Sequence, residues 1–190
     1  GQINAIERQD EDATFTFATG TLDLGQTGLG DSIAVNGACL TVTALTGDGF
    51  RADLSRETLD CTTFGELAAG AAVNFESAMR IGDALGGHLV TGHVDGVGVV
   101  RGLEDDGDSL RLEVEAPAEL ARYIARKGSV CVDGVSLTVN SVDGNAFGVM
   151  IVPHTQTHTI IADYRPGTRV NLEVDLIARY LERFLQYTEA

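Results

Sequence analysis

Apolar and polar residues alternate over many short stretches in the first half of the chain. The alternation covers residues 2–6, 13–18, 32–35, 39–45, 49–54 and 72–77. Because successive side chains of a strand point to opposite faces of its sheet, a period of two predicts strands with one buried face. About six short strands separated by glycine-rich turns, with one helical turn at 62–67, predict a small closed or nearly closed antiparallel barrel.

The same pattern returns in the second half. Alternating stretches at 94–103, 109–115, 129–132, 137–142, 146–152 and 168–174 predict further strands, and residues 117–124 predict a short helix. The expected fold class is therefore all-β, a tandem pair of similar six-stranded antiparallel barrels. A long stretch with the helical period comes only at the end of the chain, at 175–187, and predicts a C-terminal α-helix.

The two halves repeat each other at a constant offset of 97 residues. Gly-Ala-Cys-Leu-Thr-Val-Thr at 37–43 matches Gly-Val-Ser-Leu-Thr-Val-Asn at 134–140, and the match continues without a gap to Glu76 and Glu173. A period of this length is that of a whole small domain, so the chain is a tandem duplication. We place the two barrels at 1–86 and 87–175 and an oligomerisation helix at 176–190. At this offset Gly98 matches Gly1, so we expect the first barrel to lack the start of its first strand.

The predicted C-terminal helix carries an apolar stripe with polar residues on its other side. The stripe consists of Leu176, Ile177, Tyr180, Leu181, Phe184 and Leu185. An apolar stripe on a helix outside two finished barrels needs a surface to cover it. A second subunit is the interpretation we favour, and packing on the chain's own barrels is the alternative.

Composition narrows the classes of function. The net charge of −15 argues against a nucleic-acid or anionic-membrane partner, because both need a basic surface. No apolar run approaches the length of about 18 residues that a membrane helix needs, and no signal peptide opens the chain. Cys39, Cys61 and Cys131 are odd in number and lack metal-binding spacing, which argues against zinc and a disulfide framework. We therefore expect a cytoplasmic protein.

Each copy places a small polar side chain two positions before a threonine. These pairs are Cys39 with Thr41 and Ser136 with Thr138. On a strand, residues two apart share a face, so each pair can line a pocket, although ordinary strand residues would give the same pattern. No P-loop, Gly-x-Gly-x-x-Gly or Gly-x-Ser-x-Gly motif occurs, which argues against the usual nucleotide-binding and hydrolase sites.

The histidines do not suggest a metal site. His88 and His93 are five apart, so on a strand they face opposite sides. His154 and His158 are four apart on a threonine-rich stretch that we expect to be non-helical, and we interpret them as polar lining or surface residues.

Several segments, taken in this order, strongly resemble the riboflavin synthase family. They are Gly-Asp-Ser-Ile-Ala-Val-Asn-Gly-Ala-Cys-Leu-Thr-Val-Thr at 30–43, Glu-Thr-Leu at 57–59, Gly-Gly-His-Leu-Val-Thr-Gly-His-Val-Asp-Gly at 86–96, Lys-Gly at 127–128, Val-Asp-Gly-Val-Ser-Leu-Thr-Val at 132–139 and Val-Pro-His-Thr at 152–155. The resemblance covers nearly the whole chain, the C-terminal tail included.

The resemblance implies two similar barrels per chain and a homotrimer held by the C-terminal helices. It implies dismutation of two 6,7-dimethyl-8-ribityllumazine molecules by four-carbon transfer, giving riboflavin and 5-amino-6-ribitylamino-uracil, with no metal or cofactor. The active site would join the first barrel of one subunit to the second barrel of a neighbour. Association with lumazine synthase is left open. A lumazine-binding fluorescent antenna protein without turnover is the alternative function.

The resemblance also assigns residues to two pockets. The first pocket would use Cys39, Leu40, Thr41, Asp53, Leu54, Ser55, Arg56, Glu57, Thr58, Gly92, His93 and Val94. The second pocket would use Lys127, Ser136, Leu137, Thr138, Val152, Pro153, His154, Thr155, Gln156 and Thr157. The family begins with Met-Phe-Thr-Gly, a segment that reaches the active site, and this sequence does not contain it.

Within these pockets we assign chemical roles as hypotheses. His93 is the candidate proton-transfer group, because an imidazole titrates near neutral pH. Ser136 and Thr138 would orient the lumazine that donates the four-carbon unit. Cys39 or a water molecule would be the nucleophile at the ring carbon, with Asp133 in support.

Overall fold

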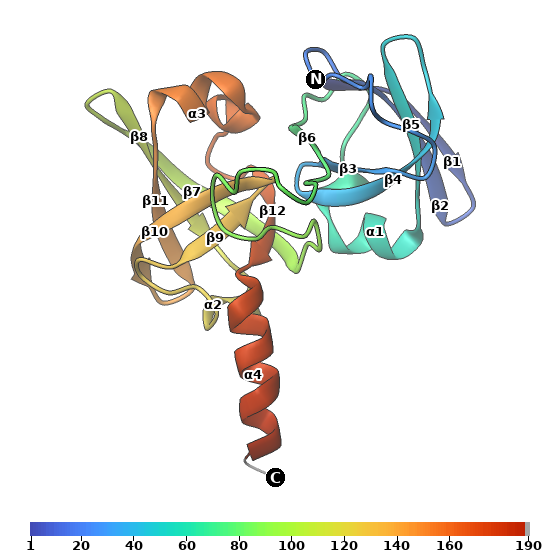
Figure 1. Cartoon of the computed structure of the whole chain (residues 1–190). Helices are drawn as coiled ribbons and strands as arrows, with labels where there is room; N and C mark the ends of the chain where they lie inside the picture. Colours follow the sequence, from blue (N-terminus) through green and yellow to red (C-terminus); the bar gives the residue numbers. More distant parts are fainter. Residues whose placement is uncertain (189–190) are drawn as a thin grey trace.

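Two six-stranded antiparallel units and a projecting C-terminal helix make up the structure, a computed structural model that describes residues 1–188 (Figure 1). The first unit contains β1 (Gln2–Gln9), β2 (Asp12–Ala18), β3 (Ser32–Val35), β4 (Ala38–Leu45), β5 (Gly49–Leu54), α1 (Arg56–Cys61), the 3₁₀ helix η1 (Thr63–Gly65) and β6 (Phe75–Ser77). The second contains β7 (Gly96–Asp106), β8 (Ser109–Glu115), α2 (Ala118–Ala121), β9 (Ser129–Val132), β10 (Val135–Asp143), β11 (Ala146–Ile151), α3 (Pro153–His158), the 3₁₀ helix η2 (Ile160–Asp163) and β12 (Arg169–Val174). Helix α4 (Leu176–Thr188) follows. The predicted fold class is confirmed.

The two units share one topology. The second unit is a closed barrel with strand order β10-β11-β8-β7-β12-β9, and the first is a sheet in the equivalent order β1-β2-β5-β4-β3-β6. In the first unit, residues 70–73 bring the two edges together. Ile3 N donates to Ala71 O over 2.9 Å and Val73 N donates to Gly1 O over 3.0 Å. The first unit is therefore nearly closed, although only Phe75–Ser77 of the closing strand predicted at 72–77 is regular.

Each unit has its own hydrophobic core, as alternating strands require. The first core contains the fully buried rings of Phe15, Phe17, Phe50 and Phe64. Phe64 meets Phe15 edge to face with centroids 5.5 Å apart, a geometry that stabilises aromatic pairs, and Phe17 stacks on Phe15 with centroids 5.8 Å apart. The second core is mainly aliphatic, with residues such as Leu172 on β12 fully buried.

Two six-residue helices correct the sequence-based prediction. Helix α1 begins directly after Ser55, whose hydroxyl accepts the N–H of Thr58, whereas we expected helical structure only at 62–67. Helix α3 contains both His154 and His158, so the expectation that this stretch is non-helical is wrong. Pro153 occupies its first turn, where the missing N–H costs nothing. Helices this short carry too few residues to show a helical period.

The two units meet at equivalent turns. Asn36-Gly37 joins β3 to β4, and Asp133-Gly134 joins β9 to β10, all four residues with positive φ, as the tight hairpin turn requires. A Cβ atom on Gly37 would lie 2.6 Å from Gly134 N, and one on Gly134 would lie 2.9 Å from Gly37 N. Glycine at both positions therefore lets the turns pack tip to tip.

Two equivalent asparagines bridge the turns. Asn74 Nδ2 donates to Asp133 O over 2.9 Å, and Asn171 Nδ2 donates to Asn36 O over 2.8 Å. Their side-chain oxygens accept the N–H of the first residue of η2 and of η1, at 2.9 and 2.8 Å. Each bond has its counterpart at the 97-residue offset, so the duplicated units are related by a pseudo-twofold axis between the two turns.

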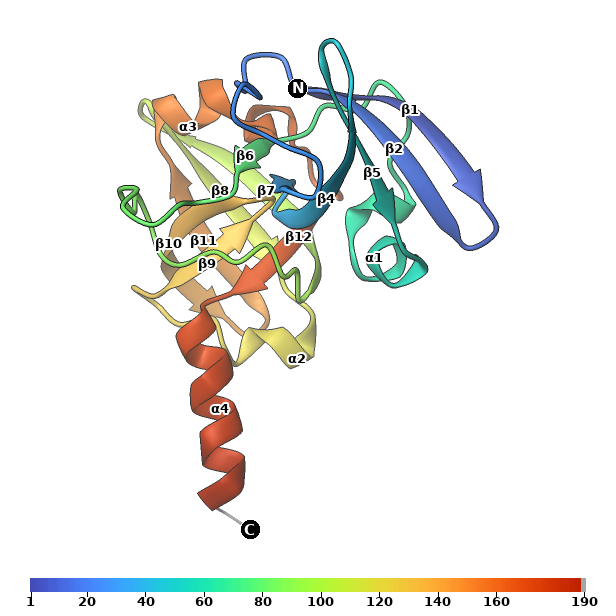
Figure 2. The ribbon, with the colours of Figure 1, turned by 45° about the vertical axis from the view of Figure 1, so that its right-hand side comes forward.

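Helix α4 points away from both units (Figure 2). Its polar side faces the second unit: Arg179 forms an ion pair with Asp95 over 2.7 Å, and Glu182 forms one with Arg122 over 2.7 Å. The apolar stripe is open, with Tyr180 and Phe184 each 69% exposed. Packing of the stripe on the chain's own barrels, the alternative left open by the sequence, is therefore wrong. No helix within residues 1–188 is long and apolar enough to cross a membrane.

Candidate functional site

The residues predicted for the first pocket, which we call the first half-site, lie mainly on the exposed face of the β4–β5 hairpin and at the start of α1. Cys39 and Thr41 are exposed, whereas Leu40 between them is buried in the core, so the predicted shared face exists. Val42 pairs with Ala52, which places Thr41 beside Asp53 on the neighbouring strand. Asp53 Oδ1 accepts a hydrogen bond from Thr14 Oγ1 over 2.7 Å. Leu54, like Leu40, is buried, so only the backbone of these two leucines can reach a ligand.

The start of α1 forms the edge of this half-site. Ser55 and Thr58 bond to each other at the helix N-terminus, with Ser55 Oγ and Thr58 Oγ1 3.3 Å apart. Arg56 forms ion pairs with Glu11 and Asp60 on the surface. Glu57 accepts a hydrogen bond from the Cys61 thiol, and this bond raises the pKa of the thiol. The side chains of Arg56 and Glu57 are thus engaged in surface contacts.

The second half-site repeats this arrangement on β10. Ser136 and Thr138 are exposed and Leu137 between them is buried. Lys127 N donates to Val139 O over 2.8 Å, which places the only lysine of the chain beside this strand. The lysine has a φ of 67°, in the left-handed region that L-residues rarely adopt. Its counterpart in the first copy is a glycine.

Helix α3 forms the edge of the second half-site. Val152 and His154 are exposed, Pro153 opens the helix, and the carbonyl of Thr155 accepts a hydrogen bond from Thr159. Two further predicted residues hold the helix together. Gln156 Nε2 donates to Ile151 O over 3.0 Å, and Thr157 Oγ1 donates to Pro153 O over 3.1 Å. The ring of His154 stacks on that of His158 with centroids 4.0 Å apart.

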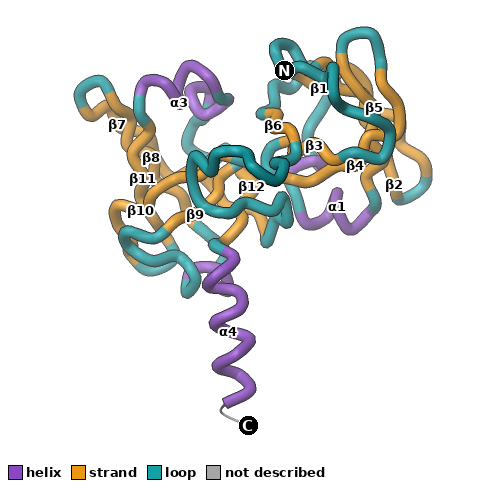
Figure 3. Tube along the Cα trace, in the orientation of Figure 1, coloured by secondary structure: helices purple, strands orange, loops and turns teal. Residues whose placement is uncertain are grey.

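One segment without helix or strand, residues 78–95, runs between the two units and touches both half-sites (Figure 3). Cys39 N donates to Gly92 O over 2.9 Å. Gly92 has a positive φ of 77°, and a Cβ atom there would lie 2.7 Å from the Cβ of Cys39. Four positions earlier, His88 Nδ1 lies 2.7 Å from Ser136 Oγ. The segment therefore contacts the two equivalent residues Cys39 and Ser136.

Two equivalent glutamates differ in their surroundings. Glu173 is 3% exposed and accepts hydrogen bonds from Thr91 N, Thr91 Oγ1 and Gly92 N, at 2.7, 2.7 and 2.9 Å. It thereby holds the connecting segment against the second unit. Glu76, at the same position in the first copy, opens onto a cavity, and partial desolvation raises the pKa of its carboxyl.

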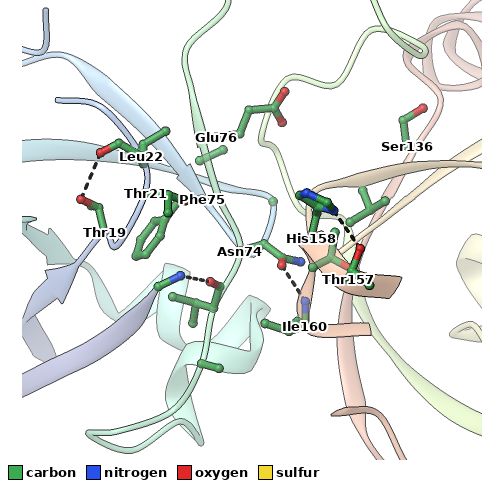
Figure 4. Close-up of a pocket in the computed structure, with 18 residues that line it drawn as sticks. Thr19, Thr21, Leu22, Asn74, Phe75, Glu76, Ser136, Thr157, His158 and Ile160 are labelled. Carbon is green, nitrogen blue, oxygen red and sulfur yellow. Dashed lines mark hydrogen bonds between the residues drawn. The ribbon is translucent and has the colours of Figure 1, made fainter. Parts of the chain in front are cut away.

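Two neighbouring cavities lie between the units. One, of about 640 Å³, is lined by Cys39 and Ser136 together with Glu76 and His88. The other, of about 750 Å³, shares Glu76 and Ser136 and is also lined by His158 (Figure 4). The structure thus brings Cys39 and Ser136 to one cavity. Four other predicted residues line neither cavity and are exposed to solvent: Thr41, Thr138, Asp53 and Lys127.

Asp133 and His93 lie outside these cavities. Asp133 is buried in the turn between β9 and β10, where desolvation raises the pKa of its carboxyl to about 7 against the opposing hydrogen bonds from Tyr164 and Asn171. Asp133 therefore stabilises the turn through which the two units contact each other. His93 is exposed, and Val94 next to it packs on the first core. The chemical roles assigned to Asp133 and His93 stay predictions.

The sequence did not predict three residues at this site: His88 and Glu76, which line a cavity, and Glu173, which holds the connecting segment. Their contacts join segments far apart in the chain, such as Thr91 and Glu173, which are 82 residues apart. The repeat did contain one signal, because Glu76 and Glu173 are its last matched pair.

Comparison with known proteins places the chain in a family. The model of the lumazine binding domain matches it twice, at residues 1–78 and 91–175. The chain is 48% identical to riboflavin synthase of Photobacterium phosphoreum, over 97% of this chain and 85% of that protein. It is 43% identical to riboflavin synthase of Mycobacterium tuberculosis strain H37Rv, over 98% and 94% of the two chains.

Solved structures agree with the fold. The crystal structure of LumP complexed with riboflavin has a TM-score of 0.84 at 25% identity, covering 92% of this chain and 94% of that one. LumP complexed with 6,7-dimethyl-8-(1'-D-ribityl) lumazine has a TM-score of 0.80 at 26% identity, with the same coverage. With two lumazine binding domains and extensive identity to these enzymes, the chain belongs to the riboflavin synthase family.

Proposed function

We propose that the chain catalyses the riboflavin synthase reaction on two molecules of 6,7-dimethyl-8-ribityllumazine. One molecule gives a four-carbon unit to the other, and the products are riboflavin and 5-amino-6-ribitylamino-uracil. The observation that carries this proposal is the pair of related but unequal half-sites, one with Cys39 and Thr41 and the other with Ser136 and Thr138. A reaction between two copies of one substrate needs two related pockets that treat the copies differently.

The chemistry requires a proton acceptor and precise orientation. The 7-methyl group of the lumazine is acidic because its carbanion delocalises into the ring, so a weak base is sufficient to remove a proton. We assign this proton transfer to His93, whose imidazole is exposed beside the first half-site. Ser136 and Thr138 orient the donor, and Cys39 or a water molecule adds to the ring carbon. Holding both rings in the reactive orientation lowers the activation barrier. In well-oriented model reactions this effect reaches about 7–11 kcal/mol.

The half-sites support a homotrimer in which two chains complete each active site. Thr41 and Thr138 are exposed and line neither cavity of the described chain, so we infer that a neighbouring chain supplies the second wall for each ligand. Helix α4 offers an exposed apolar stripe through which chains can associate. We place the enzyme in the cytoplasm, which suits its free thiols.

Incubation of the purified protein with 6,7-dimethyl-8-ribityllumazine alone tests the function. We expect one riboflavin and one 5-amino-6-ribitylamino-uracil for every two lumazine molecules consumed, measured by absorbance and chromatography. Thr138→Ala should lower the rate, whereas Thr46→Ala, in the turn after β4, is the matched control and should not. Tight lumazine binding without riboflavin would instead support a binding protein, and no binding would exclude both functions.

A further inference from the structure

His88 forms a specific contact with the hydroxyl of Ser136. Its ring Nδ1 lies 2.7 Å from Ser136 Oγ, and its backbone N–H donates to the same oxygen over 3.2 Å. Gly87 passes so close that a Cβ atom on it would lie 2.3 Å from Ser136 Oγ. Only a glycine before the histidine therefore lets the backbone and the ring reach the same hydroxyl.

The segment that carries His88 is hydrogen-bonded to both units. Four residues later, the carbonyl of Gly92 accepts the N–H of Cys39 and the N–H of Gly92 bonds to Glu173. His88 is half-buried, and its Nε2 is buried and has no hydrogen-bond partner among residues 1–188. These contacts distinguish His88 from a surface histidine.

The same segment treats the two equivalent residues differently. At Cys39 it presents only glycine backbone, whereas at Ser136 it presents an imidazole. If each half-site binds one lumazine, this difference separates the two otherwise related pockets.

We propose that His88 is a positioning residue that holds the Ser136 hydroxyl so that its hydrogen points into the cavity toward the substrate. A neutral imidazole has one donor and one acceptor nitrogen. With the hydrogen on Nδ1, the ring and the backbone N–H both donate to Ser136 Oγ, and the buried Nε2 carries only a lone pair. The other tautomer would bury an N–H without an acceptor, which is rare and costly. The role in catalysis rests on the proposed function.

Kinetics of three substitutions test the proposal. Asparagine places an N–H near the position of Nδ1, and glutamine places one near Nε2. We expect His88→Ala to lower kcat about tenfold to 100-fold, as small misplacements of a site do. His88→Asn should have a kcat within about threefold of the wild type, because the asparagine amide replaces the donor that alanine removes. His88→Gln should do no better than alanine. Leu89→Ala, an exposed neighbour in the same segment, is the control and should leave kcat unchanged.

A double substitution separates action through Ser136 from a general effect on the fold. If His88 acts through Ser136, His88→Ala should cause no further loss in a Ser136→Ala background. The proposal is overturned if the losses of kcat in the two single variants multiply in the double variant. It is also overturned if His88→Ala keeps full activity. We measure the unfolding temperature and the lumazine affinity of each variant, because these show whether a variant has failed to fold.

Nitrogen-15 NMR of the histidine rings gives a readout that does not depend on turnover. We expect His88 to show the tautomer with hydrogen on Nδ1 and to change its ring shifts in Ser136→Ala. The tautomer with hydrogen on Nε2 would overturn the proposal. A wild-type protein that makes no riboflavin but shows the expected tautomer would refute the proposed function and keep the contact, so the two failures are distinguishable.

Discussion

At the scale of single residues, Lys127 holds a backbone conformation that costs stability. Its φ is 67°, and its counterpart Gly30 has a φ of 86°. A left-handed L-residue costs roughly 1–2 kcal/mol, and replacing it with glycine costs about 0.5–1 kcal/mol of chain entropy. Strain of this kind persists where a side chain is needed for function. The second copy thus accepts a strained lysine where the first uses glycine.

Lys127→Gly should therefore separate stability from activity. We expect the free energy of unfolding to rise by about 0–1.5 kcal/mol, by the balance of these two terms. We expect kcat/KM to fall at least tenfold, because the ammonium group that the resemblance places in the second pocket is lost. Denaturation and steady-state kinetics measure both. Asp10→Gly is the control for the backbone effect, since Asp10 is exposed and left-handed in the β1–β2 turn and is not among the residues assigned to either pocket. Unchanged activity of Lys127→Gly would refute a role for the lysine.

Asp133 should make stability depend on pH. Desolvation raises the pKa of its carboxyl to about 7 in the folded protein, above its ordinary value of 3.8. The folded state therefore retains a proton that the unfolded state has lost, so stability falls as pH rises from about 4 to about 7. The loss is at most about 4 kcal/mol, at 1.36 kcal/mol per pKa unit.

Asp133→Asn copies the first unit, which has Asn36 at this position. We expect the variant to unfold at a higher temperature than the wild type at pH 8 and to show a flatter dependence between pH 4 and 7. The reciprocal Asn36→Asp should destabilise the protein at pH 8, because it buries a charge in the same contact. Parallel pH profiles for Asp133→Asn and the wild type would show that the carboxyl does not titrate as described.

At the scale of elements, strand prediction succeeded where one face of a sheet is buried. The bounds of β3, β5, β8 and β9 agree with the alternation of the sequence. The short helices α1 and α3 were missed because six residues span fewer than two turns, and a helix of that length is set by its ends. Ser55 before α1 and Pro153 at the start of α3 were the available signals.

Helix α4 is the element that we expect to drive association. Its exposed aromatic residues each contribute about 1.5–3 kcal/mol when fully buried. We therefore predict a trimer for the wild type and a monomer for the double variant Tyr180→Glu and Phe184→Glu, by light scattering after size-exclusion chromatography. Gln186→Glu adds one negative charge on the polar side, half of what the double variant adds, and should remain a trimer. A double variant that stays trimeric would place the interface elsewhere.

At the scale of the whole molecule, the duplication explains both what the sequence revealed and what it did not. The 97-residue repeat predicted the paired half-sites, because equivalent positions keep equivalent faces of a strand. It did not reveal how the units face each other. That arrangement depends on contacts such as Asn171 with Asn36, 135 residues apart, and Asn74 with Asp133, 59 residues apart. No local pattern encodes such pairs, and the pseudo-twofold axis becomes visible only in the folded chain.

A site shared between chains predicts complementation. Thr41→Ala impairs the first half-site and Thr138→Ala the second, so each variant alone should be nearly inactive. If one chain supplies the first half-site and a neighbour the second, equal mixing after dissociation should leave about a quarter of the sites intact, by random assembly. Activity should then return toward a quarter of the wild-type value. If both half-sites come from the same chain, every site carries a defect and mixing restores nothing. The cavity that joins Cys39 and Ser136 within one chain makes this second outcome a real physical alternative, and the mixing experiment decides between them.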